Sequence, residues 1–318
     1  MSVKQFEKKG KTKMEVLSAD KYSISMQLTG ESGDFFMRVY EVFPGVTITF
    51  SDAHIQTVCF EERKTKPNDM IEISYCKEGR LECNIHDKVC YLDSVDFVIA
   101  QTNGVSPALH FPLGHYHGLT IHIELKKVME NPLLLFGKEV VDVRKIIEKF
   151  SSEKSGVIAH ADSFFEHIFS DLYKVPVKNQ KGYFYIKILE LLLFLSEENI
   201  TENEFEKHCY TKAQADLAKR VREYMLAHMN VHITLKELEE HFHMSASHLK
   251  KTFKGVYGVT IVDYTRTQKM ESAAYMLEHT DKSILEIANA HGYYNGSKFA
   301  NAFRTVKGYN PKEYRKKI

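Results

Sequence analysis

The sequence SILEIANAHGYYNGSKFANAFRTVKGYNPKEY, residues 283–314, decides the fold of the C-terminal part of this chain. It repeats, with substitutions, the stretch TLKELEEHFHMSASHLKKTFKGVYGVTIVDY at residues 234–264. Leu238 aligns with Ile287 at an offset of 49 residues, and one inserted residue then changes the offset to 50. The later pairs are Leu249 and Phe299, Phe253 and Phe303, Lys254 and Arg304, Val256 and Val306, Gly258 and Gly308, and Tyr264 and Tyr314. A repeat of this kind predicts two copies of one structural unit.

Each copy is predicted to form two short helices joined by a tight turn. In the second copy, Ser283 can cap a helix, Gly292 can supply the positive φ of a turn, and small Ala288 allows the helices to cross closely. Apolar residues at helical spacing lie on both sides of the turn, namely Ile284, Ile287, Phe299 and Phe303. This pattern predicts a helix-turn-helix, whose second helix enters a major groove of DNA.

The first copy departs from this pattern at two positions. Thr234 and Glu237 have the spacing of a capping box and predict the start of a helix. Glu239 stands where the second copy has a small residue, and His243 stands where it has the turn glycine. Because histidine tolerates positive φ better than most residues, the turn is expected to form in this copy as well.

The repeat also carries a family resemblance, because its residues resemble the signature of the AraC/XylS transcription regulators. The matching positions are Lys269, Ala273, Leu277, Ile284, Ile287-Ala288, Gly292-Tyr293, Phe299, Phe303-Arg304, Gly308-Tyr309-Asn310-Pro311 and Tyr314-Arg315. The resemblance implies a DNA-binding domain with two helix-turn-helix units held by a central helix. That helix would span 260–278, with an apolar face of Ile261, Tyr264, Met270, Ala273, Ala274 and Leu277.

Groove geometry gives candidate DNA contacts, because the exposed N-terminal half of each second helix meets base edges or phosphates. In the first copy the outward residues are expected to be Ala246, Ser247, Lys250 and Lys251. In the second copy they are expected to be Gly296, Ser297, Lys298 and Asn301. The amide of Asn301 suits a bidentate contact to adenine. The alternative for each residue alone is an ordinary solvated helix face.

The charge distribution also indicates that the C-terminal region binds DNA. The net charge of the whole chain is +1, but residues 211–318 hold 18 Lys and Arg against 11 Asp and Glu. The rest of the chain holds 25 against 31. A basic C-terminal region beside an acidic remainder is typical of a protein that binds DNA through one domain.

The N-terminal part has the texture of a β domain, with short β-branched and aromatic runs broken by turn residues. The predicted strands are 35–42, 46–50, 71–76, 81–85, 89–92 and 119–123, with hairpin turns at 77–79 and 86–88 and a loose arm or edge strand over 1–20. Many short antiparallel strands favour a barrel or a sandwich. In the family that the C-terminal part resembles, this place is held by a cupin-like barrel that senses a small molecule.

Helical periodicity follows the strands. Helices are predicted over 140–150, 162–173 and 182–197, the last apolar nearly all round and therefore buried on more than one side. The resemblance implies that these helices close the sensor and form a homodimer contact; a plain core helix is the alternative. The fold class is therefore α+β, with a cupin-like antiparallel β-barrel over 1–135, a helical dimerisation or linker region over 136–210, and an all-α DNA-binding domain over 211–318.

His115 and His117 are the candidate ligand-binding residues, since both rings would point to one face of a strand. They do not suffice for a cupin metal site, which needs more ligands, so neither a metal nor a cofactor is predicted. No nucleophile elbow, P-loop or dinucleotide turn occurs in the sequence, and no catalytic residue is assigned. The stretch FPLGHYH at 111–117 resembles regulators of this family that sense iron-chelate siderophores, whereas others of the family sense fatty acids. The resemblance therefore leaves both an iron–siderophore effector and an apolar effector open.

The cysteines and the hydropathy pattern indicate the cellular compartment of the protein. Cys59, Cys76, Cys83, Cys90 and Cys209 form no CxxC pair and are expected to be reduced thiols, with redox sensing as the alternative. There is no leader-like segment at the start, and the longest apolar run, 188–195, is too short to cross a bilayer. The sequence therefore predicts a cytoplasmic protein without a membrane contact.

Together these observations predict a bacterial transcription regulator that is not an enzyme. It would bind double-stranded DNA, respond to a small-molecule effector and act with RNA polymerase, most commonly as an activator. Two alternatives stay open from the sequence: a ligand-independent regulator controlled by its abundance or by a protein partner, and a metal-dependent cupin enzyme fused to a DNA-binding tail.

Overall fold

The structure is a computed structural model that describes residues 13–30, 33–60, 70–85, 88–102, 108–130, 145–146, 156–176, 178–197 and 208–317. The chain divides into two compact units, Met1–Thr211 and Lys212–Ile318. Among the described residues, no helix combines the length and the apolar character that crossing a membrane requires.

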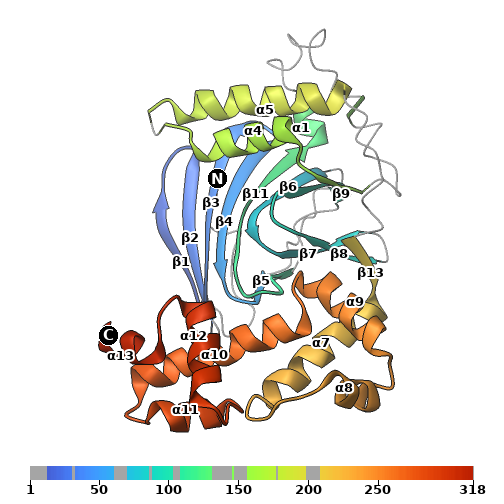
Figure 1. Cartoon of the computed structure of the whole chain (residues 1–318). Helices are drawn as coiled ribbons and strands as arrows, with labels where there is room; N and C mark the ends of the chain where they lie inside the picture. Colours follow the sequence, from blue (N-terminus) through green and yellow to red (C-terminus); the bar gives the residue numbers. More distant parts are fainter. Residues whose placement is uncertain are drawn as a thin grey trace. The chain divides into compact units, whose positions relative to one another are not determined.

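The first unit is built on two antiparallel sheets (Figure 1). The larger has the order β1-β2-β3-β4-β11-β6-β9-β12, and the smaller has the order β13-β8-β7-β10-β5. Its elements are β1 Lys13–Ala19, β2 Ser23–Gly30, β3 Gly33–Phe43, β4 Val46–His54, β5 Thr57–Cys59, β6 Met70–Gly79, β7 Leu81–Ile85, β8 Lys88–Leu92, β9 Asp96–Thr102, β10 Ala108–His110, β11 Tyr116–Glu124, α1 Leu125–Met129, β12 Val157–His160, α4 Ser163–Tyr173, α5 Gln180–Glu197 and β13 Cys209–Thr211.

The large sheet separates two hydrophobic cores, because side chains alternate between its faces along each strand. On one face, which we call the outer face, Val46, Ile48 and Leu119 belong to the same core as residues of α4 and α5. Figure 1 shows these two helices lying across that face. On the other face, which we call the inner face, Phe35 and Ala53 pack with residues of the small sheet. The N-terminal unit is thus barrel-like but not closed, followed by helices as predicted.

The predicted strands correspond to β3, β4, β6, β7, β8 and β11, and β1 is an edge strand of the large sheet. The hairpin between β7 and β8 is confirmed, since Ile85 pairs with Lys88. The hairpin predicted at 77–79 is wrong. β6 pairs with β9 and β11, whereas β7 pairs with β8 and β10, so the chain passes at Arg80 from one sheet to the other. Local turn residues cannot distinguish such a crossing from a hairpin.

The helices α4 and α5 begin and end close to the predicted positions, whereas the short helix α1, Leu125–Met129, was not predicted. Asp162 caps α4 by accepting hydrogen bonds from the backbone N–H groups of Phe164 and Phe165. The buried residues of α5 lie on one face of the helix, namely Phe184, Ile188, Leu191, Leu192 and Leu195, whereas Tyr183 and Ile186 are exposed. The prediction that this helix is buried on more than one side is therefore wrong. The helix predicted over 140–150 falls almost wholly outside the described residues.

The expectation of reduced thiols is wrong for two cysteines, because Cys90 and Cys209 form a disulfide. β13 pairs with β8, and this pairing places Cys209 opposite Cys90 although 119 residues separate them in sequence. A search for closely spaced cysteines cannot find such a pair. Of the other three thiols, Cys59 is exposed and Cys76 is buried, and burial raises the pKa of Cys76 to about 12.

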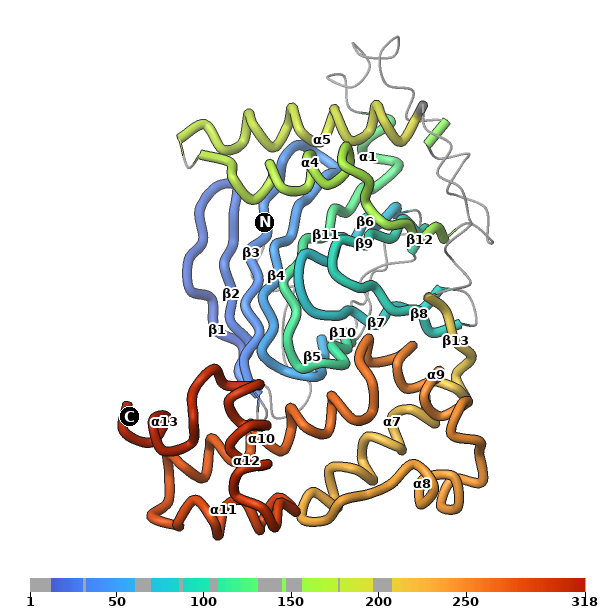
Figure 2. The backbone as a smooth tube through the Cα atoms, viewed as in Figure 1, coloured from blue at the N-terminus to red at the C-terminus, as the bar shows by residue number. Residues whose placement is uncertain are grey.

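The second unit consists of helices arranged around one long central helix. They are α7 Lys212–Ala227, α8 Leu235–Phe242, α9 Ala246–Tyr257, α10 Ile261–His279, α11 Ile284–Ala290, α12 Gly296–Lys307 and α13 Pro311–Lys317. In the tube view, α10 runs from the pair α8–α9 to the pair α11–α12 (Figure 2). The six apolar residues predicted for its inward face, between Ile261 and Leu277, are all buried.

The helix caps follow the sequence in both copies. Thr234 and Glu237 form a capping box at α8, and Ser283 and Glu286 form another at α11. His243 ends α8 with a φ of 54°, so this residue adopts the left-handed conformation expected of it. The carboxylate of Glu239 accepts a hydrogen bond of 2.5 Å from the backbone N–H of Ala246. The acidic residue that replaces a small one therefore helps to cap the second helix of its own unit.

Lys269 connects the two copies through the interior of the second unit. It lies on α10, is only 6% exposed, and its Nζ donates to the carbonyls of Val231 (2.8 Å) and His291 (2.9 Å). Burial lowers the pKa of this amine. One carbonyl precedes the first helix-turn-helix and the other lies at the turn of the second, so one side chain satisfies both segments.

We expect Lys269→Met to destabilise the second unit by about 2 kcal/mol. Methionine keeps most of the volume but leaves two buried carbonyls without a donor. The free-energy cost of these lost hydrogen bonds is larger than the gain from no longer burying a charged amine. Hydrogen exchange of α8 and α11 amides in the full-length chain measures the effect. Lys254→Met, at an exposed position of α9, is the control. Equal protection in both variants would contradict this role of Lys269.

Candidate DNA-binding surface

The second helix of each copy presents one buried and one exposed face. On α9, Leu249 and Phe253 are each 1% exposed, and on α12 Phe299 and Phe303 are fully buried. These residues fix the rotation of each helix. Of the predicted contact residues, Ser247, Lys250, Lys251, Gly296, Ser297, Lys298 and Asn301 are exposed, and Ala246 is partly exposed. We call these eight residues the recognition surface.

The two halves of the recognition surface are related by the offset of 50 residues. Ala246 corresponds to Gly296, Ser247 to Ser297, and Lys251 to Asn301. The caps that precede them also correspond. Ser245 accepts from the backbone N–H of His248, and Asn295 accepts from those of Ser297 and Lys298. Both helices therefore start at the same position of their repeat and turn equivalent residues outward.

The charges of the recognition surface are available to a partner. Within the described residues, no carboxylate lies within ion-pair distance of Lys250, Lys251 or Lys298, whereas Lys307 nearby pairs with Glu271. The unit as a whole carries the basic excess seen in the sequence. An exposed row of unpaired amines with an amide and hydroxyls among them has the chemistry that phosphates and base edges require.

The repeat alignment identifies further candidates that the reasoning from single helix faces missed. His248 corresponds to Lys298 and is partly exposed. Tyr294, directly before the cap of α12, is 81% exposed, and its counterpart Met244 is 44% exposed. Carrying the candidate Lys298 across the repeat would have found His248 from the sequence alone, whereas Tyr294 and Met244 are shown by their exposure in the structure.

The turn between α11 and α12 contains a buried imidazole. His291 is 3% exposed, and its Nδ1 lies 2.7 Å from the carbonyl of Ile287. Burial lowers the pKa of His291 below its usual 6.5, and Lys269 lowers it further, against the effect of the Ile287 carbonyl. The next residue, Gly292, has a φ of 74°, and a Cβ there would lie 3.0 Å from the carbonyl oxygen of Asn230. The turn is thus closely packed around a neutral histidine.

We expect this part of the fold to lose stability as the pH falls from 7.5 to 5.5. The folded state holds His291 neutral, whereas the unfolded chain takes up a proton near pH 6.5, so the stabilisation is complete above that value and declines below it. Hydrogen exchange of α11 and α12 amides reports the change. In His291→Asn, whose amide can replace the bond to Ile287, the decline should disappear. The same pH dependence in both proteins would assign it to another group.

The candidate ligand-binding histidines do not lie as expected. β11 begins at Tyr116, so His115 precedes the strand and is exposed, and the two rings do not share a strand face. His117 is partly buried, with its ring 5.2 Å from that of Tyr173, and it lines a cavity of the first unit. Burial, followed by the charge of Lys77, lowers the pKa of His117.

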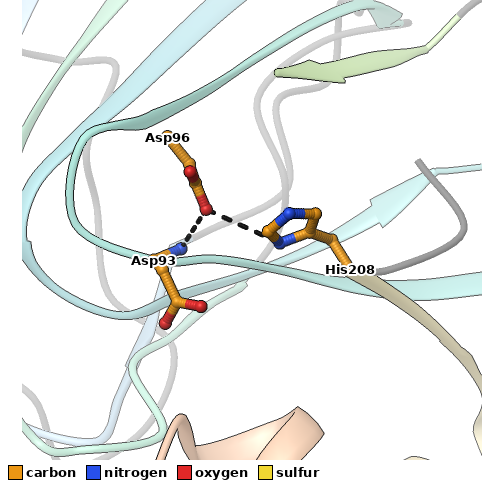
Figure 3. Close-up of side chains that lie close together, drawn as sticks. All are labelled: Asp93, Asp96 and His208. Carbon is orange, nitrogen blue, oxygen red and sulfur yellow. Dashed lines mark hydrogen bonds and ion pairs between the residues drawn. The ribbon is translucent and has the colours of Figure 1, made fainter. Parts of the chain in front are cut away.

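A separate group of polar residues lies around the starts of β9 and β13, where Asp96 begins β9 and His208 directly precedes β13. Asp93, Asp96 and His208 have ligand-type atoms within 4.8 Å of one another (Figure 3). However, Asp96 already accepts from the backbone N–H of Asp93 and lies 2.9 Å from His160 Nδ1, and the buried guanidinium of Arg80 contacts Asp93. A fixed cation beside these carboxylates competes with a metal ion, so the group is a charge network that holds His208.

The family match lies within the second unit. A helix-turn-helix domain family matches residues 238–317. An HTH-type transcriptional regulator of Staphylococcus aureus is 33% identical over 100 residues, which is 31% of this chain and 13% of that protein. The Msm operon regulatory protein of Streptococcus mutans is 26% identical over 132 residues, covering 42% of this chain and 46% of that protein. This chain therefore spans less than half of the length of these relatives.

Among solved structures, the C-terminal domain of the response regulator AraT from Geobacillus stearothermophilus is similar. It shares 29% identity with a TM-score of 0.32, over 32% of this chain and 85% of that domain. The matched family covers the duplicated unit, and the geometry of that unit has the caps, the turns and the outward faces that the signature predicts. Residues 238–317 of this chain thus form a helix-turn-helix DNA-binding domain of the AraC type.

Proposed function

We propose that this protein is a transcription regulator that binds double-stranded DNA through the recognition surface. The observation that carries the proposal is the equivalence of α9 and α12. Both are the second helix of a capped helix-turn-helix, and both expose the N-terminal half at matching repeat positions. Each would enter one major-groove segment, and the two segments would lie about one helical turn apart.

The base readout of this surface would be modest. Ser247, Gly296 and Ser297 are short, so they allow close approach but offer few hydrogen bonds to bases. Asn301 suits adenine, and the lysines suit guanine or phosphate. Part of the sequence preference would then come from the shape and deformability of the DNA.

The first unit would act as the sensor of this regulator. A small-molecule effector bound there would shift the DNA-binding unit between arrangements through its different affinity for each. The region 136–210 would serve as the dimerisation and linker region, and activation through RNA polymerase would be the outcome. The support is the division into two units and a cavity in the first of them.

Selection from a random DNA library, followed by hydroxyl-radical footprinting, tests the DNA-binding part. We expect an enriched site in which two protected segments are separated by about 10 base pairs, as two recognition helices on one duplex require. Enrichment of no sequence, or protection of one short segment only, would contradict the twin-helix proposal.

A further inference from the structure

The first unit contains a cavity of about 380 Å³ on the outer face of the large sheet. Its walls come from β2, β3, β4 and β11 on one side and from α4 and α5 on the other. Phe50 and Tyr40 pack against the outer core, and Asp52 shares their face because it lies two residues from Phe50. The volume falls within the range of small-molecule sites in proteins.

The wall contains five aromatic rings, those of Phe36, Tyr40, Phe50, Tyr173 and Phe184. Tyr40 and Phe184 have ring centroids 5.0 Å apart, and Phe50 lies 5.2 Å from Tyr173. These rings come from two strands and two helices, so the wall is assembled from segments far apart in sequence. A surface of this kind favours the flat or aliphatic body of an organic molecule.

One cation stands at the edge of the cavity. Arg38 lines it and is exposed, its Nε donates to Ser25 Oγ at 2.9 Å, and its Nη1 lies 3.5 Å from the hydroxyl of Tyr40. Two hydroxyls thus hold the guanidinium, and within the described part of the chain no carboxylate forms an ion pair with it. Asp52, which also lines the cavity, has its carboxylate 3.3 Å from the His54 imidazole. The planar fork of Arg38 remains open to a ligand carboxylate.

Neutral polar groups complete the lining. The hydroxyl of Tyr173 is buried and has no hydrogen-bond partner among the residues that the structure describes. Burial raises the pKa of this hydroxyl, so it remains a donor at neutral pH. His117 has its pKa lowered by burial and by Lys77, whose Nζ lies 4.5 Å from the Tyr173 ring.

We propose that this cavity binds a small monocarboxylate with an aromatic or aliphatic body. Its carboxylate would pair with Arg38, its body would lie against Phe50, Tyr40 and Phe184, and a further polar group would meet His117. The inference rests on the proposed sensor function and gives it a site and a ligand class. The site lies outside the two facing sheets, under α4 and α5, and not between the sheets.

Isothermal titration calorimetry with full-length protein and three probes, benzoate, 2-naphthoate and decanoate, tests the proposal. We expect saturable binding of one equivalent of at least one probe. Arg38→Gln should weaken that binding about 10-fold or more, because it removes a charge-assisted pair. If 2-naphthoate is the probe that binds, 2-naphthalenemethanol should bind the unmodified protein and Arg38→Gln equally, because this alcohol has no charge to pair with Arg38. Val175→Trp, which fills the cavity from its helix side, should abolish binding of acid and alcohol alike.

Lys126→Gln is the matched control, because it removes one positive charge from an exposed position of α1 that does not line the cavity. Circular dichroism shows whether each variant is folded. Failure of all three probes to saturate at millimolar concentration, or unchanged binding in both Arg38→Gln and Val175→Trp, would overturn the proposal. DNA selection without any probe tests the proposed regulator separately, so an intact DNA result beside a failed titration would reject the cavity alone.

Discussion

Alanine at Lys250, Lys251, Lys298 and Asn301 together is expected to weaken binding to the selected DNA site by about 1,000-fold. Each lysine is exposed and has no carboxylate partner among the described residues, so each contributes about 1 kcal/mol through phosphate or guanine contacts. Asn301 contributes about 2 kcal/mol if its amide reads an adenine. The combined loss of roughly 5 kcal/mol corresponds to more than three orders of magnitude in the dissociation constant. Fluorescence anisotropy with labelled DNA measures it.

The salt dependence of the single variants separates the two kinds of contact. A lysine that neutralises a phosphate releases a counterion, so its removal lowers the slope of log affinity against log salt by about one. Lys250→Ala should show this change and weaken all sequences alike. Asn301→Ala should leave the slope unchanged and relax the preference at one base pair. A variant with Lys282, Lys312 and Lys316 changed to alanine loses the same charge away from α9 and α12. If that control loses as much affinity, overall charge and not the recognition surface carries the binding.

The second unit could be predicted closely because its determinants are local. A cap lies three residues from the group it satisfies, and a turn is set by one residue, as at Thr234 and His243. The buried stripes repeat within one helix, so Leu249 and Phe253 already fix which residues of α9 face outward. The hydrogen bonds of Lys269 could not be predicted in this way. Its partners, the carbonyls of Val231 and His291, are far from it in sequence and come close only in the folded unit.

The first unit was predicted less well because its determinants are non-local. Alternating side chains predict a strand but not its neighbours, and β6 pairs with β11 about forty residues later in the chain. For the same reason the sequence did not show that His117 lies beside Tyr173 of α4, or that His115 lies away from it. The alternation of side chains along a strand predicts which sheet face a residue lies on. It does not predict which helix covers that face.

Cys209→Ser is expected to lower the free energy of unfolding of the first unit by about 4 kcal/mol. The disulfide to Cys90 closes a loop of 119 residues, and a cross-link over so long a loop removes much of the conformational entropy of the unfolded chain. Chemical denaturation of the full-length protein, followed through the fluorescence of its tyrosines, gives the value. Cys59→Ser is the matched control, since Cys59 is a free and exposed thiol.

The loss of stability in Cys209→Ser should be localised in the structure. β13 has only three residues, Cys209–Thr211, and apart from the disulfide it is held by its pairing with β8 and by the contacts of His208 to Asp96 and the Tyr91 carbonyl. Hydrogen exchange in Cys209→Ser should therefore rise first at β8 and β13. Because Lys212 of α7 follows Thr211 directly, release of β13 would lengthen the connection between the first and the second unit. Unchanged exchange at β13 in this variant would show that the strand pairing alone holds the connection.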